Sequence, residues 1–365
     1  QYGGHMRFQK FLKGKRVVLM FHGDTKDLIR RYIYEVQLDG YNNEKVYNYR
    51  RLAFLTEGNC QLIKPELKES VRKKAIYIEN GMDFEEGPSL YQENGEFALV
   101  SRLDRDKNPV EAIDIFMNEK MNPSYRLHIY GDGALKAEME QKIADAGLQD
   151  RIILHGFVSD KKEIYGNKQG VISTSLTDGL PLTLLESIQY GVPVYVYDSF
   201  TACRDMVTEK TGRLIETGNQ EAFVEALNNA FDMNAFDSRE IKEKFSNKVI
   251  TEKWMALFAE LDEEVAREMS KTAADVSAAA NAPATKSSFK KRLKKSLKNG
   301  LLKNEFTAAK LGVMYRNLKT GSKNKSLPMV SVIMPYYYNR KTVEKAVKSV
   351  VKSGYPNYEI VLVND

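Results

Sequence analysis

Along residues 1–250, short apolar runs alternate with longer segments in which apolar residues recur at helical spacing. Runs such as 96–102 and 170–174 have the length and composition of buried strands, and 110–116 has the amphipathic pattern of a helix. The predicted strands are 16–21, 52–56, 74–78, 96–102, 126–130, 152–158, 170–174 and 192–198. Strands that alternate with helices are typical of an α/β fold with parallel strands, and residues 88–250 are its clearest Rossmann-like domain.

The segment 173–193 carries clear signals for a turn, a helix and a helix end. Small polar residues lead to Gly179 and Pro181, which end the preceding strand, and Gly191-Val-Pro193 ends the helix. The apolar residues expected to form one stripe on this helix are Leu182, Leu184, Leu185 and Ile188. The segment is therefore predicted to be a strand, a loop and a helix.

A helix that begins at Gly179–Thr183 would present unpaired backbone N–H groups and the positive end of its dipole, which together bind anions such as phosphate. Asp178 precedes this helix and Glu186 lies about two turns into it, so both could reach hydroxyl groups beside that phosphate. The alternative for an isolated pair of this kind is that Asp178 only caps the helix and Glu186 is a solvated helix residue.

Two cations and a histidine lie at the carboxyl ends of predicted strands, where doubly wound sheets bind ligands. Arg102 and Lys107 lie on the loop that follows strand 96–102. They suit a pyrophosphate, the arginine as a two-pronged donor and the lysine as a point charge. His22 follows strand 16–21. The alternatives are that both cations are solvated and that His22 is a packed or exposed loop residue.

The order of these residues resembles that of the retaining GT-B glycosyltransferases of the glycosyl transferases group 1 type, which use nucleotide sugars. The motifs that carry the resemblance are S-R-L-x-x-x-K at 101–107, G-D-G at 131–133, H-G-F at 155–157 and D-x7-E at 178–186. The last is similar to the E-x7-E signature of the family. Asp178 stands where the family usually has Glu, which removes one methylene from the contact to the donor sugar, whereas Glu186 matches the ribose-binding position.

The resemblance implies a donor site that needs no metal ion or other cofactor. The implied catalytic residues are His22, Arg102, Lys107 and Asp178. The two cations would stabilise the leaving diphosphate, and the other two would face the sugar. The implied donor-binding residues are Gly131, Gly133, Gly156, Phe157, Gly179, Leu182, Thr183 and Glu186.

By the same resemblance, Gly156 and Phe157 would border the base pocket. Gly131 and Gly133 have the alternative that they only turn a strand into a helix with positive φ. No carboxylate is evidently placed as a covalent nucleophile, so the resemblance implies front-face attack with retention of configuration.

The resemblance also predicts how the chain is divided. The expected parts are a partial amino-terminal GT-B domain (1–87) ending in a crossing at 80–83, a nucleotide-sugar-binding domain (88–250), a closing helix (251–270), a linker (271–327) and the incomplete start of a GT-A, family-2-like domain (328–365). The predicted fold class is therefore α/β of GT-B type: two Rossmann-like domains, the first truncated, a helical basic linker and a partial GT-A βαβ unit.

Within the linker, apolar residues recur every four positions among Lys and Arg. They are Phe289, Leu293, Leu297 and Leu301. This pattern predicts a basic amphipathic helix at 289–306 that suits an anionic membrane surface. The alternative is a solvated helical spacer between domains.

Composition excludes several other classes. Hydrophobic residues make up 42% and charged residues 28%, as in ordinary globular chains, and the net charge is a mild +6. The absence of zinc-ligand spacing and of an RNP-like motif argues against a nucleic-acid partner. No apolar run approaches about 18 residues, the length of a spanning helix. Cys60 and Cys203 form no motif and are expected to be packing residues in a reducing, cytoplasmic setting.

The resemblance implies a glycosyltransferase that moves a sugar from a nucleotide sugar, one linked to UDP, to a cell-surface acceptor. The acceptor would be a glycan or a polyol-phosphate polymer, as in teichoic-acid or capsule synthesis. The protein would be bifunctional and cytoplasmic, lying on the inner face of the membrane. Alternatives are a nucleotide-sugar epimerase of the same fold, for which His22 is the evident acid/base candidate, and a non-catalytic fragment that binds nucleotide sugar.

Overall fold

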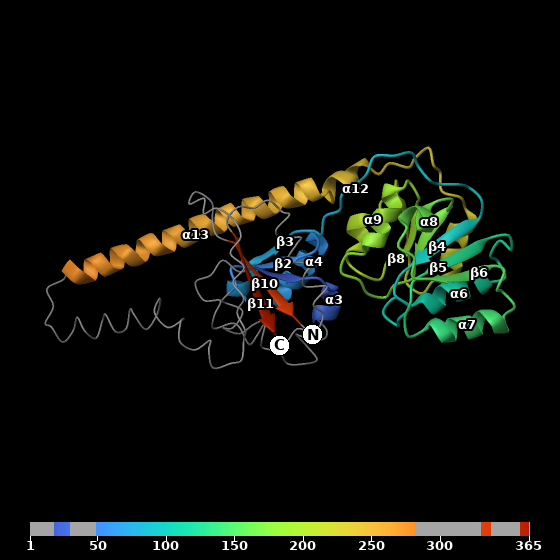
Figure 1. Ribbon diagram of the computed structural model, residues 1–365, viewed down its shortest axis with the longest axis horizontal. Coiled ribbons are helices and arrows are strands. Elements are labelled where there is room, and N and C mark those ends of the chain that lie inside the picture. The colour runs from blue at the N-terminus through green and yellow to red at the C-terminus, as the bar shows by residue number, and fades with distance from the viewer. Residues whose placement is uncertain (1–17, 30–48, 282–329, 337–357, 365) are drawn as a thin grey trace. The chain divides into compact units, whose positions relative to one another are not determined.

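The computed structural model describes residues 18–29, 49–281, 330–336 and 358–364 (Figure 1). The chain divides into two compact units. The larger unit comprises 19–42 and 51–254, and the smaller comprises 1–18, 43–50 and 255–365. The α/β class with parallel strands predicted from the sequence is confirmed in both units.

Six parallel strands form the main sheet of the larger unit. They are β4 (Glu96–Val100), β5 (Arg126–Tyr130), β6 (Ile152–Gly156), β7 (Gly170–Ser173), β8 (Val194–Tyr197) and β9 (Gly212–Ile215). Their order is β6-β5-β4-β7-β8-β9. The first strand in sequence thus lies in the middle and the chain moves outward from it twice, which is the doubly wound arrangement. The sequence predicted all of these strands except β9.

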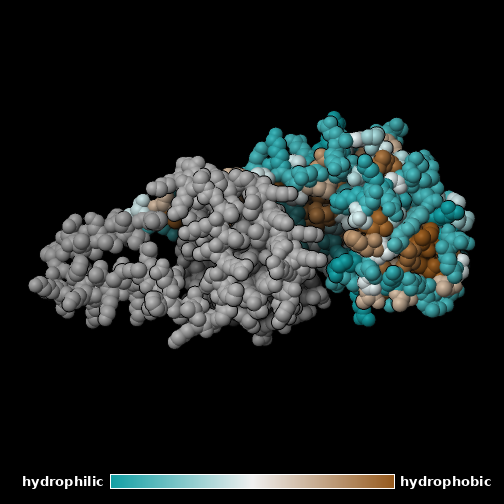
Figure 2. All heavy atoms as spheres, viewed as in Figure 1, coloured by the Kyte–Doolittle hydropathy of each residue, from teal (hydrophilic) through white to brown (hydrophobic). Residues whose placement is uncertain are grey.

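Helices cover both faces of this sheet, and each face has its own hydrophobic cluster. The helices α6 (Pro109–Met117), α7 (Lys136–Asp145) and α11 (Gln220–Asn228) pack into one cluster. The helices α8 (Lys161–Tyr165), α9 (Leu182–Gln189), α10 (Cys203–Met206) and α12 (Arg239–Lys244) pack into the other. In the view of Figure 2, the coloured surface is mainly hydrophilic, and smaller hydrophobic areas interrupt it.

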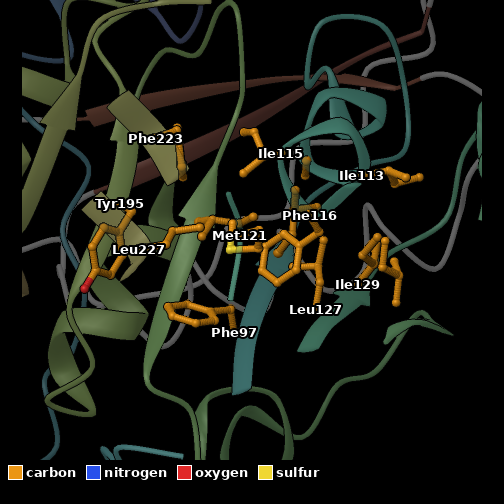
Figure 3. Packing of buried hydrophobic residues seen from close by; sticks show 14 of the residues in the cluster. Phe97, Ile113, Ile115, Phe116, Met121, Leu127, Ile129, Tyr195, Phe223 and Leu227 are labelled. Atoms are coloured by element: carbon orange, nitrogen blue, oxygen red, sulfur yellow. The ribbon is translucent and has the colours of Figure 1, made fainter. Parts of the chain in front are cut away.

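Strand β4 shows how the two-residue period of a strand builds both clusters. Phe97 and Leu99 belong to the first cluster, whereas Ala98 between them belongs to the second. The Phe97 ring makes edge contacts at 6.1 Å with Phe116 on α6 and with Tyr195 on β8 (Figure 3). Such a strand is buried on both faces, which is why its sequence is almost continuously apolar.

A second, three-stranded sheet in the larger unit has the order β1-β2-β3. Its strands are β1 (Val18–Phe21), β2 (Arg51–Phe54) and β3 (Ala75–Tyr77), each lying within a predicted strand or starting one residue before it. The helices beside them are α3 (Thr25–Leu28), α4 (Glu57–Ile63), the 3-10 turn Lys64–Glu66 and α5 (Glu69–Arg72). The rings of Phe21 and Phe54 stack at 4.9 Å and join β1 to β2.

The segment predicted as a crossing, 80–83, is bonded to the start of the long helix α13 (Asn247–Asn281). Met82 N–H donates to the carbonyl of Phe245 (2.9 Å), and Asn247 N–H donates to the carbonyl of Met82 (3.0 Å). A Cβ atom at Gly81 would lie 2.4 Å from the end of the Asn247 side chain, so the two segments pack closely. The crossing is therefore held by these backbone hydrogen bonds and by Met82, which packs against the second hydrophobic cluster.

Helix α13 differs from the sequence-based expectation. It contains the predicted closing helix 251–270 but continues to Asn281, so residues 271–281 are helical rather than linker. These residues are rich in alanine, which has the highest helix propensity of all residues, and this outweighs a composition that otherwise resembles a linker. The predicted basic helix 289–306 lies outside the described residues.

The smaller unit contains a parallel pair of strands, β10 (Val330–Tyr336) and β11 (Tyr358–Asn364). Val330 lies opposite Tyr358, and Tyr336 lies opposite Asn364. Both strands were predicted within 328–365. The helix expected between them and Asp365 lie outside the described residues.

Two further findings concern the described parts of the chain. None of their helices combines the length and the apolar composition required to cross a bilayer. Cys60 and Cys203 are both buried and free, which confirms their assignment as packing residues.

Backbone contacts at Gly131 and Gly133 set the shape of the loops after β4 and β5. Gly131 has a φ of 145°, and a Cβ atom there would lie 1.8 Å from the carbonyl oxygen of Ser101. At Gly133 a Cβ atom would lie 2.4 Å from the carbonyl oxygen of Leu103. The packing of the two loops therefore explains both glycines, in agreement with the structural alternative considered for them.

We predict that Gly131→Ala lowers the free energy of unfolding by about 2–5 kcal/mol, because it adds a backbone clash to an unfavourable φ. Gly147→Ala is the matched control, since Gly147 also has a positive φ (66°) but no atom lies within 4 Å of its Cβ position. The control should lose only about 1–2 kcal/mol. Urea denaturation measures both, and equal losses would contradict the packing argument.

Candidate functional site

Two loops meet at the point where the strand order of the main sheet reverses, between β4 and β7. The helices that follow these strands, α6 and α9, pack on opposite faces of the sheet, so the loops 101–108 and 174–181 begin at neighbouring strand ends and lead to opposite faces. Thr174 Oγ1 donates to the carbonyl of Asn108 (2.8 Å), and Leu176 N–H donates to the carbonyl of Asp106 (3.0 Å). Ligands of doubly wound sheets bind at this position.

The structure joins two of the predicted catalytic residues across this junction. Lys107 Nζ forms an ion pair with Asp178 Oδ2. The two side chains are only 14% and 19% exposed, so water screens this pair less than it screens a pair on the surface. A surface pair typically contributes about 0–1 kcal/mol to the free energy of unfolding. Asp178 does not cap the following helix, because the N-cap of α9 is Pro181. The helix-cap alternative for Asp178 is therefore wrong.

Arg102 is in a different environment from Lys107. Its side chain is mostly exposed and pairs with Asp104 on its own loop. Asp104 also receives the backbone N–H of Lys107 at its carbonyl (3.1 Å). The two predicted cations therefore lie on one loop, but only Lys107 is tied to Asp178.

The N-terminus of α9 has the features expected of an anion site. Within the described residues, no side chain makes a capping hydrogen bond at this end. Leu182 is 40% exposed at the first turn, so it does not belong to the buried apolar stripe that was predicted to include it. The buried side of α9 is formed instead by Leu184, Leu185, Ser187 and Ile188. Leu182 and Thr183 are thus the first two residues of the helix, at the end that has no side-chain cap within the described residues.

His22 and Gly179 lie against each other, although they come from loops far apart in the sequence. A Cβ atom at Gly179 would lie 1.9 Å from the carbonyl oxygen of His22, so only glycine allows this approach. Thr177 Oγ1 lies 3.4 Å from a carboxylate oxygen of Asp24, two residues beyond His22. Burial lowers the pKa of His22, which favours the neutral imidazole at pH 7. The loop after β1 therefore contributes to the same site as the loop before α9.

Two residues that the sequence did not identify hold the carboxylate of Glu186. Tyr165 OH donates to Oε2 (2.7 Å), and Lys161 Nζ pairs with Oε1. The Glu186 side chain is 16% exposed, so it is not a solvated helix residue as the alternative proposed. Because Lys161 and Tyr165 are four positions apart on α8, they share one face of that helix. This four-residue spacing is the sequence feature from which Lys161 and Tyr165 could have been identified as neighbours on one helix face.

Gly156 and Phe157 lie at the end of β6. Gly156 has a φ of 72°, and its carbonyl accepts from Gly131 N–H (2.7 Å). The Phe157 side chain is 81% exposed. An aromatic ring this exposed is available to stack on a flat ligand.

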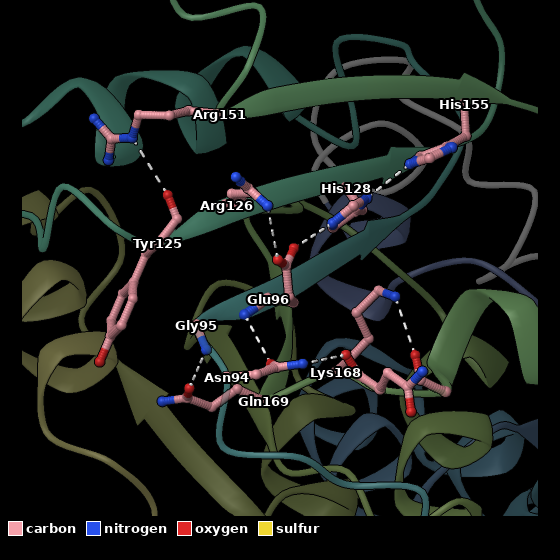
Figure 4. A network of polar contacts seen from close by, with 12 residues as sticks. Asn94, Gly95, Glu96, Tyr125, Arg126, His128, Arg151, His155, Lys168 and Gln169 are labelled. Atoms are coloured by element: carbon pink, nitrogen blue, oxygen red, sulfur yellow. Dashed lines mark hydrogen bonds and ion pairs between the residues drawn. The ribbon is translucent and has the colours of Figure 1, made fainter.

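A chain of polar contacts links β4, β5 and β6 beside this loop (Figure 4). His128 lies between Glu96 (Nε2 to Oε2, 2.5 Å) and His155 (Nδ1 to Nε2, 2.8 Å). The His155 ring stacks on Tyr130 at 4.5 Å. Burial, and then the neighbouring His128 and Lys168, lower the pKa of His155, which outweighs the opposite effect of Glu163.

The described residues hold no group of three or more His, Cys, Asp or Glu side chains arranged to bind a metal ion. The groups that could hold an anionic ligand are instead Lys107, Arg102 and the N-terminus of α9.

His155 gives a prediction about the pH dependence of stability. Its folded-state pKa lies below the ordinary 6.5, so the unfolded chain takes up a proton first as the pH falls. Above pH 6.5 His155 is neutral in both states and does not lower the free energy of unfolding. As the pH falls from 6.5 through the lowered pKa, the free energy of unfolding decreases, because the unfolded chain binds the proton more tightly. We expect His155→Gln to make the free energy of unfolding less dependent on pH between about 6.5 and 5. Urea denaturation at several pH values tests this, and an unchanged slope would contradict it.

Two family models match parts of this chain. Residues 84–249 match the family model described as glycosyl transferases group 1, and residues 331–365 match that of glycosyl transferase family 2. The poly(ribitol-phosphate) alpha-N-acetylglucosaminyltransferase of Staphylococcus aureus is 27% identical over 50% of this chain and 38% of its own length. The poly(glycerol-phosphate) alpha-glucosyltransferase of Bacillus subtilis is 26% identical over 58% of this chain and 32% of its own length.

One solved structure shows the same fold. The pneumococcal O-GlcNAc transferase GtfA, crystallised with UDP and GlcNAc, superposes with a TM-score of 0.59 at 18% identity. The match covers 72% of this chain and 55% of GtfA. The chain therefore spans about a third of the two sequence relatives and about half of this structural neighbour.

Proposed function

We propose that this chain transfers a sugar from a UDP-linked donor to a cell-surface glycopolymer, with retention of configuration. The match of residues 84–249 to the family model of glycosyl transferases group 1 supports the reaction class. The observation that carries the proposal is the Lys107–Asp178 pair at the reversal of strand order, beside the uncapped N-terminus of α9. Two relatives act on polyol-phosphate polymers by name, and the structural neighbour binds UDP. The names of the relatives support a polyol-phosphate polymer as the acceptor, and that of the neighbour supports UDP as the nucleotide of the donor.

In this proposal the diphosphate of the donor lies between the loop after β4 and the start of α9. Negative charge grows on the diphosphate as its bond to the sugar breaks. Lys107, Arg102 and the N–H groups of Leu182 and Thr183 would stabilise that charge. Lys107 is well placed for this, because Asp178 keeps its ammonium group ordered before the donor arrives.

The other side chains would bind the two ends of the donor. Asp178 and His22 would face the sugar, and Glu186 would accept hydrogen bonds from the ribose hydroxyls. Gly131, Gly133, Gly156 and Phe157 would border the base, with the exposed Phe157 ring available for stacking. The acceptor hydroxyl would attack from the face on which the diphosphate leaves, and no step assigned here requires a metal ion.

The proposal extends to the domains of the chain. Residues 1–87 would be part of the acceptor-side domain of a GT-B enzyme, and residues 88–250 would be its donor-side domain. The match of 331–365 to a second glycosyltransferase family supports a bifunctional protein. The basic segment 289–306 would hold such a protein at the cytoplasmic face of an anionic membrane.

We predict that Lys107→Ala lowers kcat/KM about 10²- to 10³-fold, the usual cost of removing one donor that stabilises a developing anion. Release of UDP from UDP-N-acetylglucosamine or UDP-glucose, with a polyol-phosphate polymer as acceptor, is the readout. Lys120→Ala is the control, because Lys120 is an exposed lysine that also pairs with a carboxylate, that of Glu221. Equal activity of the two variants would refute the role of Lys107.

Calorimetry tests the donor class directly. We expect UDP to bind more tightly than GDP or ADP, equally well with and without magnesium, and Arg102→Ala to weaken the binding. Tighter binding of GDP or ADP would correct the base, and a strict requirement for magnesium would contradict the proposed charge stabilisation. No binding of any nucleotide would contradict the donor site in this chain.

A further inference from the structure

Each oxygen of the Glu186 carboxylate contacts a side chain of the neighbouring helix α8. Tyr165 OH donates to Oε2 (2.7 Å), and Lys161 Nζ pairs with Oε1. Contacts on both oxygens fix the plane of the carboxylate as well as its position. A carboxylate offers about four acceptor sites, so two contacts leave acceptor capacity for a ligand.

The two contacts differ in rigidity. Tyr165 is fully buried, and its ring stacks on Tyr190 at 5.7 Å, so its hydroxyl group has little freedom to move. Lys161 is about half exposed on a flexible stem. Hydrogen bonds to charged groups are stronger than exposed ion pairs, so Tyr165 should contribute more to the orientation of Glu186 than Lys161 does.

Burial of Tyr165 does not by itself require that its hydroxyl group donates to a carboxylate. A buried phenol needs one acceptor, and a backbone carbonyl would supply it without tying up an ionised side chain. Burial and the nearby Glu186 both raise the pKa of Tyr165, so it stays a hydrogen-bond donor throughout the ordinary pH range. Tyr165 OH can therefore donate to Glu186 Oε2 throughout this pH range.

We propose that Tyr165 and Lys161 are positioning residues that orient the Glu186 carboxylate toward the vicinal hydroxyls of the donor ribose. This inference rests on the proposed function, because it takes Glu186 to be the ribose ligand. It adds two residues of α8 to the donor site. It also assigns the recognition of ribose to three side chains acting together rather than to Glu186 alone.

The test compares the binding of UDP with that of 2′-deoxy-UDP and 3′-deoxy-UDP by calorimetry, on the full chain. The unsubstituted chain should prefer UDP by about tenfold or more. Tyr165→Phe should reduce this preference to about twofold while keeping most of the affinity for the deoxynucleotides. Lys161→Met should reduce it by a smaller factor.

Tyr197→Phe is the matched control. Tyr197 is also buried and also donates to a carboxylate, Glu111 Oε1 (2.9 Å), but this pair joins β8 to α6 rather than α8 to α9. This variant loses an equivalent hydrogen bond and should keep the full preference for UDP. A loss of preference in this control equal to that in Tyr165→Phe would mean a general loss of order and would overturn the inference.

The remaining outcomes separate the inference from the function on which it rests. Full preference for UDP in Tyr165→Phe, together with its loss in Glu186→Ala, would overturn the positioning role and keep the function. Absence of UDP binding by the unsubstituted chain would overturn both. If Tyr165→Phe does not fold by circular dichroism, Lys161→Met decides, and an unchanged preference in that variant would overturn the inference.

Discussion

The ion pair between Lys107 and Asp178 is the interaction on which the rest of the site depends. It joins the loop after β4 to the loop after β7, and these strands are neighbours whose helices pack on opposite faces of the sheet. The two loops lead to opposite faces of the sheet, and this ion pair and two hydrogen bonds hold them together at its edge. In the proposed function, an anionic ligand at this junction would meet Lys107 and the start of α9 together.

Close backbone contacts determine where these loops lie. Gly131 packs on the carbonyl of Ser101, and Gly179 packs on the carbonyl of His22. At both places any side chain would collide with the backbone, so the loops can approach only because a Cβ atom is missing. The same contacts that give the loops their shape also bring His22 beside the helix that carries Glu186.

The charged side chains proposed for the site pair with one another. Lys107 pairs with Asp178, Lys161 with Glu186, and Arg102 with Asp104. Since the partly buried cation already has a carboxylate partner, the folded chain does not carry the cost of an unpaired buried charge. In the proposed function, a diphosphate would be an additional acceptor for cations that are already ordered. Such ordering in advance would reduce the entropy that binding otherwise costs.

The fold class, most of the strands and the order of the motifs could be predicted from the sequence, because buried parallel strands and amphipathic helices leave local patterns in their apolar residues. The sequence also identified Lys107, Asp178 and Glu186, since each lies next to a strand end or a helix start. It could not indicate that Lys107 and Asp178 form a pair, that Tyr165 and Lys161 hold Glu186, or that Leu182 is exposed. These facts depend on which strand ends are neighbours and on which side of α9 faces α8, and contacts between residues distant in sequence have no periodic signature.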